Sequence, residues 1–136
     1  MNIVDTSLWI EFFAGAKLDA SIMRVMMNRN ELFVPVICLY EVRKKFLNDN
    51  DPAKADLAMD IMKNGKIISM DFETATLAAD FGKQHKLPMA DSIIYATAQL
   101  HNAEIYTQDR HFEGLGGVRY FAKPFNFLTL VPSLRF

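Results

Sequence analysis

Short apolar segments alternate with amphipathic segments along the chain. The short segments are rich in Ile, Val, Phe and Tyr, and they predict strands at residues 3–4, 32–37, 66–70, 104–107 and 118–121. Apolar residues at helical spacing predict helices at residues 8–13, from 18 to about 30, at 39–46, from 51, from 71 and at 93–100. This alternation favours an α/β fold of three layers, α/β/α, around a mostly parallel sheet of four or five strands.

Particular residues refine these elements. Thr6 and Ser7 are candidate caps for the first helix, and Asp71 for a later one. Pro35 suggests that its strand is an edge strand or contains a bulge. In the helix from residue 51, the expected apolar face consists of Leu57, Ile61 and Met62.

Composition bounds the class of protein. The chain has 136 residues, 51% hydrophobic and 23% charged, which favours one globular domain with a proper core. Cys38 is the one cysteine, so an intramolecular disulfide is impossible and a reducing cytoplasm is expected. We expect neither a signal peptide nor a membrane span. Residues 123–136 do not follow the alternation and form an atypical C-terminal tail after a domain of residues 1–122.

Charge does not identify a partner. The net charge is −1 and gives no global basic footprint for nucleic acid. Basic residues at 43–45 and 110–111 could contact phosphates, although on charge alone solvated helix faces are the better explanation of such clusters. The histidines, at positions 85, 101 and 111, show no metal-ligand spacing and are expected at the surface.

Four acidic residues fall at equivalent places in the predicted sheet. Asp5 directly follows the first strand, and Asp109 follows residues 104–107 after one intervening residue. Glu41 and Asp91 lie near the starts of two helices. Because parallel strands bring their carboxyl ends to one edge, where ligands bind in open α/β sheets, we expect the four carboxylates to converge.

Converging carboxylates predict a cation. They repel one another unless some are protonated or a cation is bound, and all-oxygen ligands suit Mg²⁺ or Mn²⁺ better than zinc. Each acid also has a simpler explanation: Asp5 and Asp91 as helix caps, Glu41 as a solvated helix residue and Asp109 as a turn residue. Their joint placement at one edge favours the metal site.

The motifs IVDTSLWI, LYEV and LPMADSIIYATAQLHNAEIYTQD, followed by Phe112, resemble those of the PIN-domain ribonucleases, and most of all the VapC toxins of toxin–antitoxin pairs. The resemblance covers roughly residues 1–122, and residues 87–109 are its most specific part. It implies a PIN-like fold and a cluster of four acids that binds one or two Mg²⁺ or Mn²⁺ ions. Matched motif to motif, these acids are Asp5, Glu41, Asp91 and Asp109.

The resemblance also implies an activity and partners. The reaction would be metal-dependent hydrolysis of RNA phosphodiester bonds, with hydroxyls near the acids at Thr6 and Thr107 and, less specifically, at Ser92. Arg43, Lys44 or Arg110 would hold the RNA backbone, by proximity in sequence to Glu41 and Asp109. Family members commonly form homodimers and are inhibited by a cognate antitoxin that binds DNA, so contact with DNA would be indirect.

Other functions fit parts of the sequence. A housekeeping PIN nuclease in RNA processing would share the four acids. A signalling receiver domain also clusters acids at strand ends, with Asp71 or Lys123 as faint matches, but it gives no role to Glu41 or to the T-x-D motif that ends at Asp109. A non-catalytic binding domain is disfavoured because all four acids are present.

Overall fold

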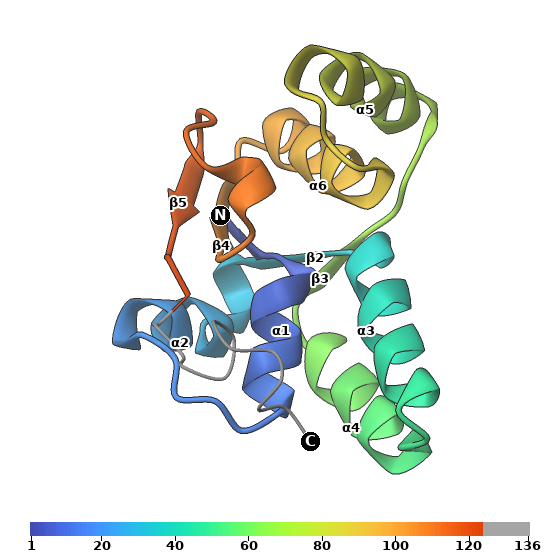
Figure 1. Ribbon diagram of the computed structural model, residues 1–136, viewed down its shortest axis with the longest axis vertical. Coiled ribbons are helices and arrows are strands. Elements are labelled where there is room, and N and C mark those ends of the chain that lie inside the picture. Colours follow the sequence, from blue (N-terminus) through green and yellow to red (C-terminus); the bar gives the residue numbers. More distant parts are fainter. Residues whose placement is uncertain (124–136) are drawn as a thin grey trace, which may run out of the picture.

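The sheet has the predicted strands, all of them parallel. The computed structural model describes residues 1–123, so nearly all of the predicted tail lies outside the described residues. The strands are β1 (Asn2–Val4), β2 (Leu32–Pro35), β3 (Lys66–Ile68), β4 (Glu104–Thr107) and β5 (Val118–Tyr120). They lie in the order β3-β2-β1-β4-β5, and each neighbouring pair is parallel. The predicted α/β architecture with a parallel sheet is confirmed (Figure 1).

The helices cover both faces of this sheet. They are α1 (Thr6–Phe13), α2 (Ala20–Met27), α3 (Val36–Asn48), α4 (Pro52–Met62), α5 (Phe72–His85) and α6 (Met89–Leu100), with short 3₁₀ helices η1 (Arg29–Glu31) and η2 (Arg110–Phe112). The chain moves from β1 through β2 to β3 and then returns to β4 on the other side of β1. Because parallel crossovers are right-handed, this reversal places α5 and α6 on the opposite face from the preceding helices, as Figure 1 shows.

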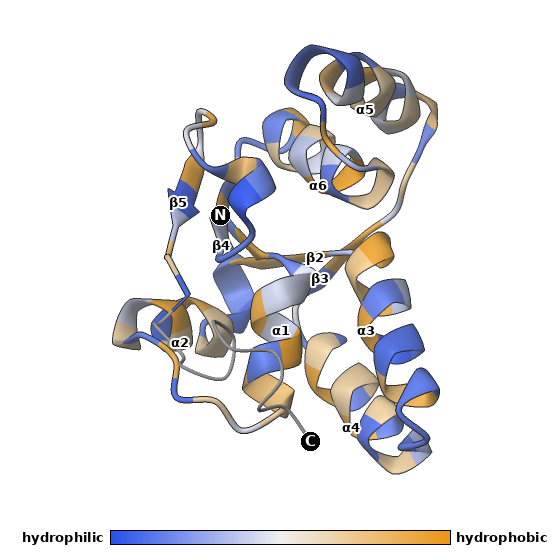
Figure 2. Cartoon of the chain, viewed as in Figure 1, coloured by the Kyte–Doolittle hydropathy of each residue, from blue (hydrophilic) through white to orange (hydrophobic). Residues whose placement is uncertain are grey.

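Helix α6 is the most deeply buried helix. Every residue from Ser92 to Ala98 is buried, which is expected only of a helix covered on more than one side. The sheet lies against one side of α6, and α5 packs on another through Ala78. Figure 2 shows by contrast that α3 carries hydrophobic and hydrophilic residues on different sides.

Aromatic side chains hold α1 to α3. Trp9 is 2% exposed and stacks on Phe13, with 5.9 Å between ring centroids. Phe13 in turn meets Phe46 of α3 edge-on at 6.1 Å. These contacts fix the helix that begins directly after β1 and thereby fix the position of Asp5.

Two predictions about strand β2 are wrong. The apolar run at residues 32–37 is divided, because the strand ends at Pro35 and Val36 already begins α3. Pro35 also does not mark an edge, since β2 lies between β3 and β1. A proline is tolerated here because it is the last residue of the strand, where it serves as the N-cap of the helix.

Two predictions about helices also need correction. Helix α4 buries Ala55, Ala58 and Met62, whereas Leu57 and Ile61 are 53% and 38% exposed. Small residues therefore make up most of the buried face of α4. The cap of α1 is Asp5 and not Thr6 or Ser7, which lie inside the helix.

Within residues 1–123, none of the helices combines the length and apolar character needed to cross a membrane.

Candidate active site

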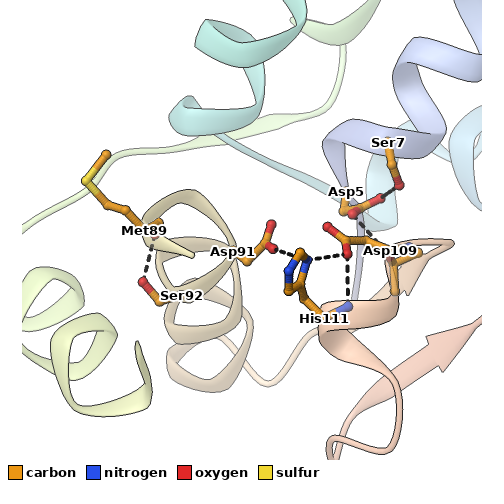
Figure 3. Close-up of polar contacts among 8 residues, drawn as sticks. Asp5, Ser7, Met89, Asp91, Ser92, Asp109 and His111 are labelled. Atoms are coloured by element: carbon orange, nitrogen blue, oxygen red, sulfur yellow. Dashed lines mark hydrogen bonds and ion pairs between the residues drawn. The ribbon is translucent and has the colours of Figure 1, made fainter. Parts of the chain in front are cut away.

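The acids lie at the topological switch point of the sheet, where the strand order reverses between β1 and β4. Strands β1 and β4 are neighbours, although β2 and β3 separate them in sequence, and ligands of open α/β sheets bind beside such a reversal. Asp5 follows β1 as the N-cap of α1, and Asp109 follows β4 as the N-cap of η2. Asp91 lies in the first turn of α6 and reaches the same place from the opposite face (Figure 3).

Asp5 is a buried carboxylate held by hydroxyl groups. Asp5 is only 2% exposed. Its Oδ1 accepts a hydrogen bond from Ser7 Oγ at 2.7 Å and a longer one from the backbone N–H of Leu8 at 3.4 Å. Oδ2 accepts from Thr107 Oγ1 at 2.8 Å. Burial raises the pKa of Asp5 to about 6 despite these hydrogen bonds, and the charge of Asp109 raises it slightly further.

Thr107 joins the ends of the neighbouring strands β1 and β4. Its fully buried hydroxyl donates to Asp5 and accepts from the backbone N–H of Asp109 at 2.9 Å. One hydroxyl therefore fixes both the carboxylate after β1 and the backbone that carries the carboxylate after β4.

Asp91 and Asp109 meet at His111. His111 Nδ1 lies 2.7 Å from Asp109 Oδ1 and 3.3 Å from Asp91 Oδ2. Figure 3 draws both contacts as dashed lines. Burial, followed by the negative charges of Asp109 and Asp5, raises the pKa of Asp91 to about 7, and His111 opposes this shift. The carboxylates are close enough to disfavour one another's ionised forms, which is the electrostatic condition of a cation site.

Glu41 joins this group through a hydroxyl. It lies in the second turn of α3, not the first, and its Oε1 accepts a hydrogen bond from Thr6 Oγ1 at 2.6 Å. Thr6 is the residue after Asp5, so Glu41 is tied to the same strand end. Cys38, one turn earlier in α3, has its pKa raised, first by burial and then by the charges of Asp5, Glu41 and Asp91.

Two other residues expected at the site have different surroundings. Ser92 lies on the far side of α6 from Asp91, where its hydroxyl donates to the Met89 carbonyl at 2.7 Å (Figure 3). Arg43 forms an exposed ion pair with Asp56 of α4 at 3.0 Å. Arg110 is exposed in η2, directly after Asp109.

The structure adds two residues that the sequence pattern did not identify. Ser7 binds Asp5, and the spacing D-x-S, in which a serine hydroxyl reaches back two residues, was the available signal. His111 is exposed, as expected of a surface histidine, yet its ring contacts two of the acids. Its signal was the spacing D-x-H after a strand.

The donor atoms fit a divalent cation. Among the described residues, Asp91, Asp109 and His111 can each offer one atom such that all three lie within 4.8 Å of one another. The set is dominated by carboxylate oxygens, which suits Mg²⁺ or Mn²⁺. Asp5 is close enough for its charge to raise the pKa of Asp91, and Glu41 is tied to the residue after Asp5 through Thr6.

Comparisons with known proteins agree with the fold. The structure resembles a toxin–antitoxin complex from Klebsiella pneumoniae, with 22% identity over 90% of this chain and 100% of that chain and a TM-score of 0.73. It also resembles DNA-bound VapBC from Salmonella typhimurium, with 18% identity over 90% of this chain and 98% of that chain and a TM-score of 0.71.

A third similar structure is a VapC toxin of Mycobacterium tuberculosis described as cleaving the sarcin–ricin loop. Its identity is 18% over 85% of this chain and 95% of that chain, with a TM-score of 0.69. No curated protein sequence matches this chain. The sequence profile of the PIN domain matches residues 3–118, from β1 to the start of β5. On this match, the chain belongs to the PIN-domain family.

Proposed function

We propose that the protein is a Mg²⁺- or Mn²⁺-dependent endoribonuclease that acts as the toxin of a toxin–antitoxin pair. Membership of the PIN-domain family supports a hydrolase that acts on nucleic acids. The observation that carries the proposal is the convergence of Asp5, Asp91 and Asp109, two of them with strongly raised pKa values. Perturbed carboxylates at a ligand-binding sheet edge are typical of a catalytic site.

The residues have distinct roles in this proposal. Asp91 and Asp109 would hold the cation, with Asp5 and Glu41 completing the negative site. Bound there, a divalent cation supplies an acidified water and offsets the negative charge of the scissile phosphate. Ser7 and Thr107 hold Asp5 in one orientation through hydrogen bonds, so the site does not have to reorganise during the reaction.

Basic residues beside the acids can hold the RNA backbone. Arg110 is exposed next to Asp109 and is the best placed of the three predicted residues. Arg43 is engaged with Asp56, but both side chains are largely exposed, and such a pair contributes only about 0–1 kcal/mol. Phosphate contact can therefore replace it. Lys44 lies over the ring of Tyr40, 5.6 Å from its centroid.

The similar structures support a proposal about partners. Several of these are antitoxin complexes, some of them bound to DNA. We propose a cognate antitoxin as the inhibitor, a homodimer as the toxin's assembly, indirect contact with DNA through the antitoxin, and the cytoplasm as the location. Two large apolar side chains, Met89 at 75% and Phe72 at 85% exposed, begin α6 and α5 and offer surface for a protein partner.

The test is cleavage of total cellular RNA by the purified, antitoxin-free protein. The reaction is run with Mg²⁺ or Mn²⁺ and with EDTA, for the wild type and for Asp5→Asn and Asp91→Asn. Asp60→Asn is the matched control, since Asp60 is an exposed acid on α4 paired with Lys63. Discrete metal-dependent products that are lost in both site variants support the proposal. Absence of cleavage by folded, metal-loaded wild type contradicts it.

Two further tests separate a toxin from a housekeeping nuclease. A toxin should be inhibited by a small protein encoded beside its gene and should arrest growth when expressed alone. Cleavage without either property would favour the housekeeping role in RNA processing.

A further inference from the structure

His111 contacts two of the acids, but it is not one of the four predicted site residues. It lies in η2, between Arg110 and the fully buried Phe112, so the backbone that carries it is anchored. The backbone N–H of His111 donates a hydrogen bond to Asp109 Oδ1 at 2.9 Å. The ring is thereby directed at the acids, with Nδ1 close to one oxygen of Asp109 and one of Asp91 (Figure 3).

The spacing of these atoms matches a shared ion. Adjacent ligands of an octahedral ion with bonds of about 2.1 Å lie about 3 Å apart. The two distances from His111 Nδ1, 2.7 Å to Asp109 and 3.3 Å to Asp91, bracket that value. The ligand atoms of the three side chains therefore already lie about as far apart as neighbouring ligands of one cation.

We propose that His111 is a nitrogen ligand of the divalent ion held by Asp91 and Asp109, and that it makes the site favour Mn²⁺ over Mg²⁺ more than an all-oxygen site would. The inference rests on the metal site of the proposed function. Imidazole binds first-row transition ions well, whereas Mg²⁺ retains a strong preference for oxygen. Loss of the ring should therefore weaken Mn²⁺ binding far more than Mg²⁺ binding.

A different role for the same contact makes the opposite prediction. If His111 were a counter-ion that the metal displaces, the ring would compete with the cation for the two carboxylates. Its removal would then strengthen metal binding, and no nitrogen would be bonded to the metal. The two roles thus differ in the sign of a measurable effect.

The experiment measures metal binding by the full chain directly and needs no substrate. Pulsed electron paramagnetic resonance of bound Mn²⁺ detects coupling to a ligand ¹⁴N, and titrations with Mn²⁺ and with competing Mg²⁺ give the two affinities. The variants are His111→Ala, His111→Gln and the control His101→Ala. His101 is the C-cap of α6, at the opposite end of that helix from Asp91.

We expect ¹⁴N coupling in the wild type and in His101→Ala, and none in either His111 variant. Mn²⁺ affinity should fall at least about tenfold in His111→Ala, with a much smaller change for Mg²⁺. Absence of ¹⁴N coupling in the wild type, or tighter Mn²⁺ binding by His111→Ala, overturns the inference. RNA cleavage that persists alongside such a result leaves the proposed function standing, whereas failure of the wild type to bind Mn²⁺ removes the metal site itself.

Discussion

Replacing Asp91 with Asn should make the metal-free protein more stable at alkaline pH while removing the proposed activity. The folded-state pKa of Asp91 is raised from 3.8 to about 7, a difference of about 3 units. Each unit corresponds to about 1.4 kcal/mol, so keeping this carboxylate ionised in the folded protein costs about 4 kcal/mol. Asn has a similar shape and no charge to bury.

The direction in which stability changes with pH follows from proton binding. Between the unfolded and folded pKa values, the folded state binds more protons than the unfolded state, so stability falls as pH rises through this window. The contribution of Asp91 is fully present below its unfolded pKa and is lost above about pH 7. Of the roughly 4 kcal/mol, about 3 should be lost between about pH 5 and about pH 8. Asp5, with a pKa raised to about 6, adds a loss of the same sign in a slightly more acidic window.

The assay is urea unfolding in EDTA at both pH values, for wild type, Asp91→Asn and the exposed control Asp60→Asn. The free energy of unfolding of the wild type should drop more steeply with pH than that of Asp91→Asn, and Asp60→Asn should follow the wild type. If the stability profiles of wild type and Asp91→Asn run parallel from about pH 5 to about pH 8, the pKa of Asp91 is not raised by burial and neighbouring charge, and the electrostatic reasoning is wrong.

Three further outcomes can be checked by unfolding or melting curves. Thr107→Val keeps the shape of the side chain but removes the hydrogen bonds to Asp5 and from the Asp109 backbone, and should cost about 2–4 kcal/mol at neutral pH; an unchanged stability would mean that this hydroxyl is replaceable. Gly65→Ala should destabilise by about 1–3 kcal/mol, since its Cβ would lie 2.8 Å from Val34 Cγ2, whereas Gly116→Ala meets nothing within 4 Å and should be neutral. Equal effects of the two substitutions would mean that the side chain of Val34 makes room for the added methyl group. Mg²⁺ should raise the melting temperature more at about pH 8 than at about pH 5, because the carboxylates must be ionised to bind it; the reverse order would exclude these acids as ligands.

The order of elements was predictable from the sequence because strands and helices differ in the period of their apolar residues. The strand ends at Val4 and Thr107 were predictable for the same reason, and with them the positions of Asp5 and Asp109. The limits of that pattern appear at Pro35, where an apolar strand runs into an apolar helix and the period alone gives no boundary.

Side-chain direction on helices was less predictable from sequence proximity. Residues one or two apart on a helix point in different directions, so Ser92 cannot share the direction of Asp91, nor Arg43 that of Glu41. Proximity in sequence therefore did not predict which way the side chains of Ser92 and Arg43 point. The role of His111 depends on the conformation of the short η2 helix, which has no periodic signal of its own.

The hydroxyl of Thr107 also constrains when the site can form during synthesis. It joins residues separated by 102 positions, and Asp5 is made near the start of translation while its partner strand β4 is made near the end of the domain. A nascent chain therefore carries Asp5 and Glu41 without Asp109 until the sheet is almost complete. Contacts of such long sequence separation form late in folding. Under the proposed function, a partly synthesised chain would lack Asp109 and be inert, and the complete site would form only once β4 has entered the sheet.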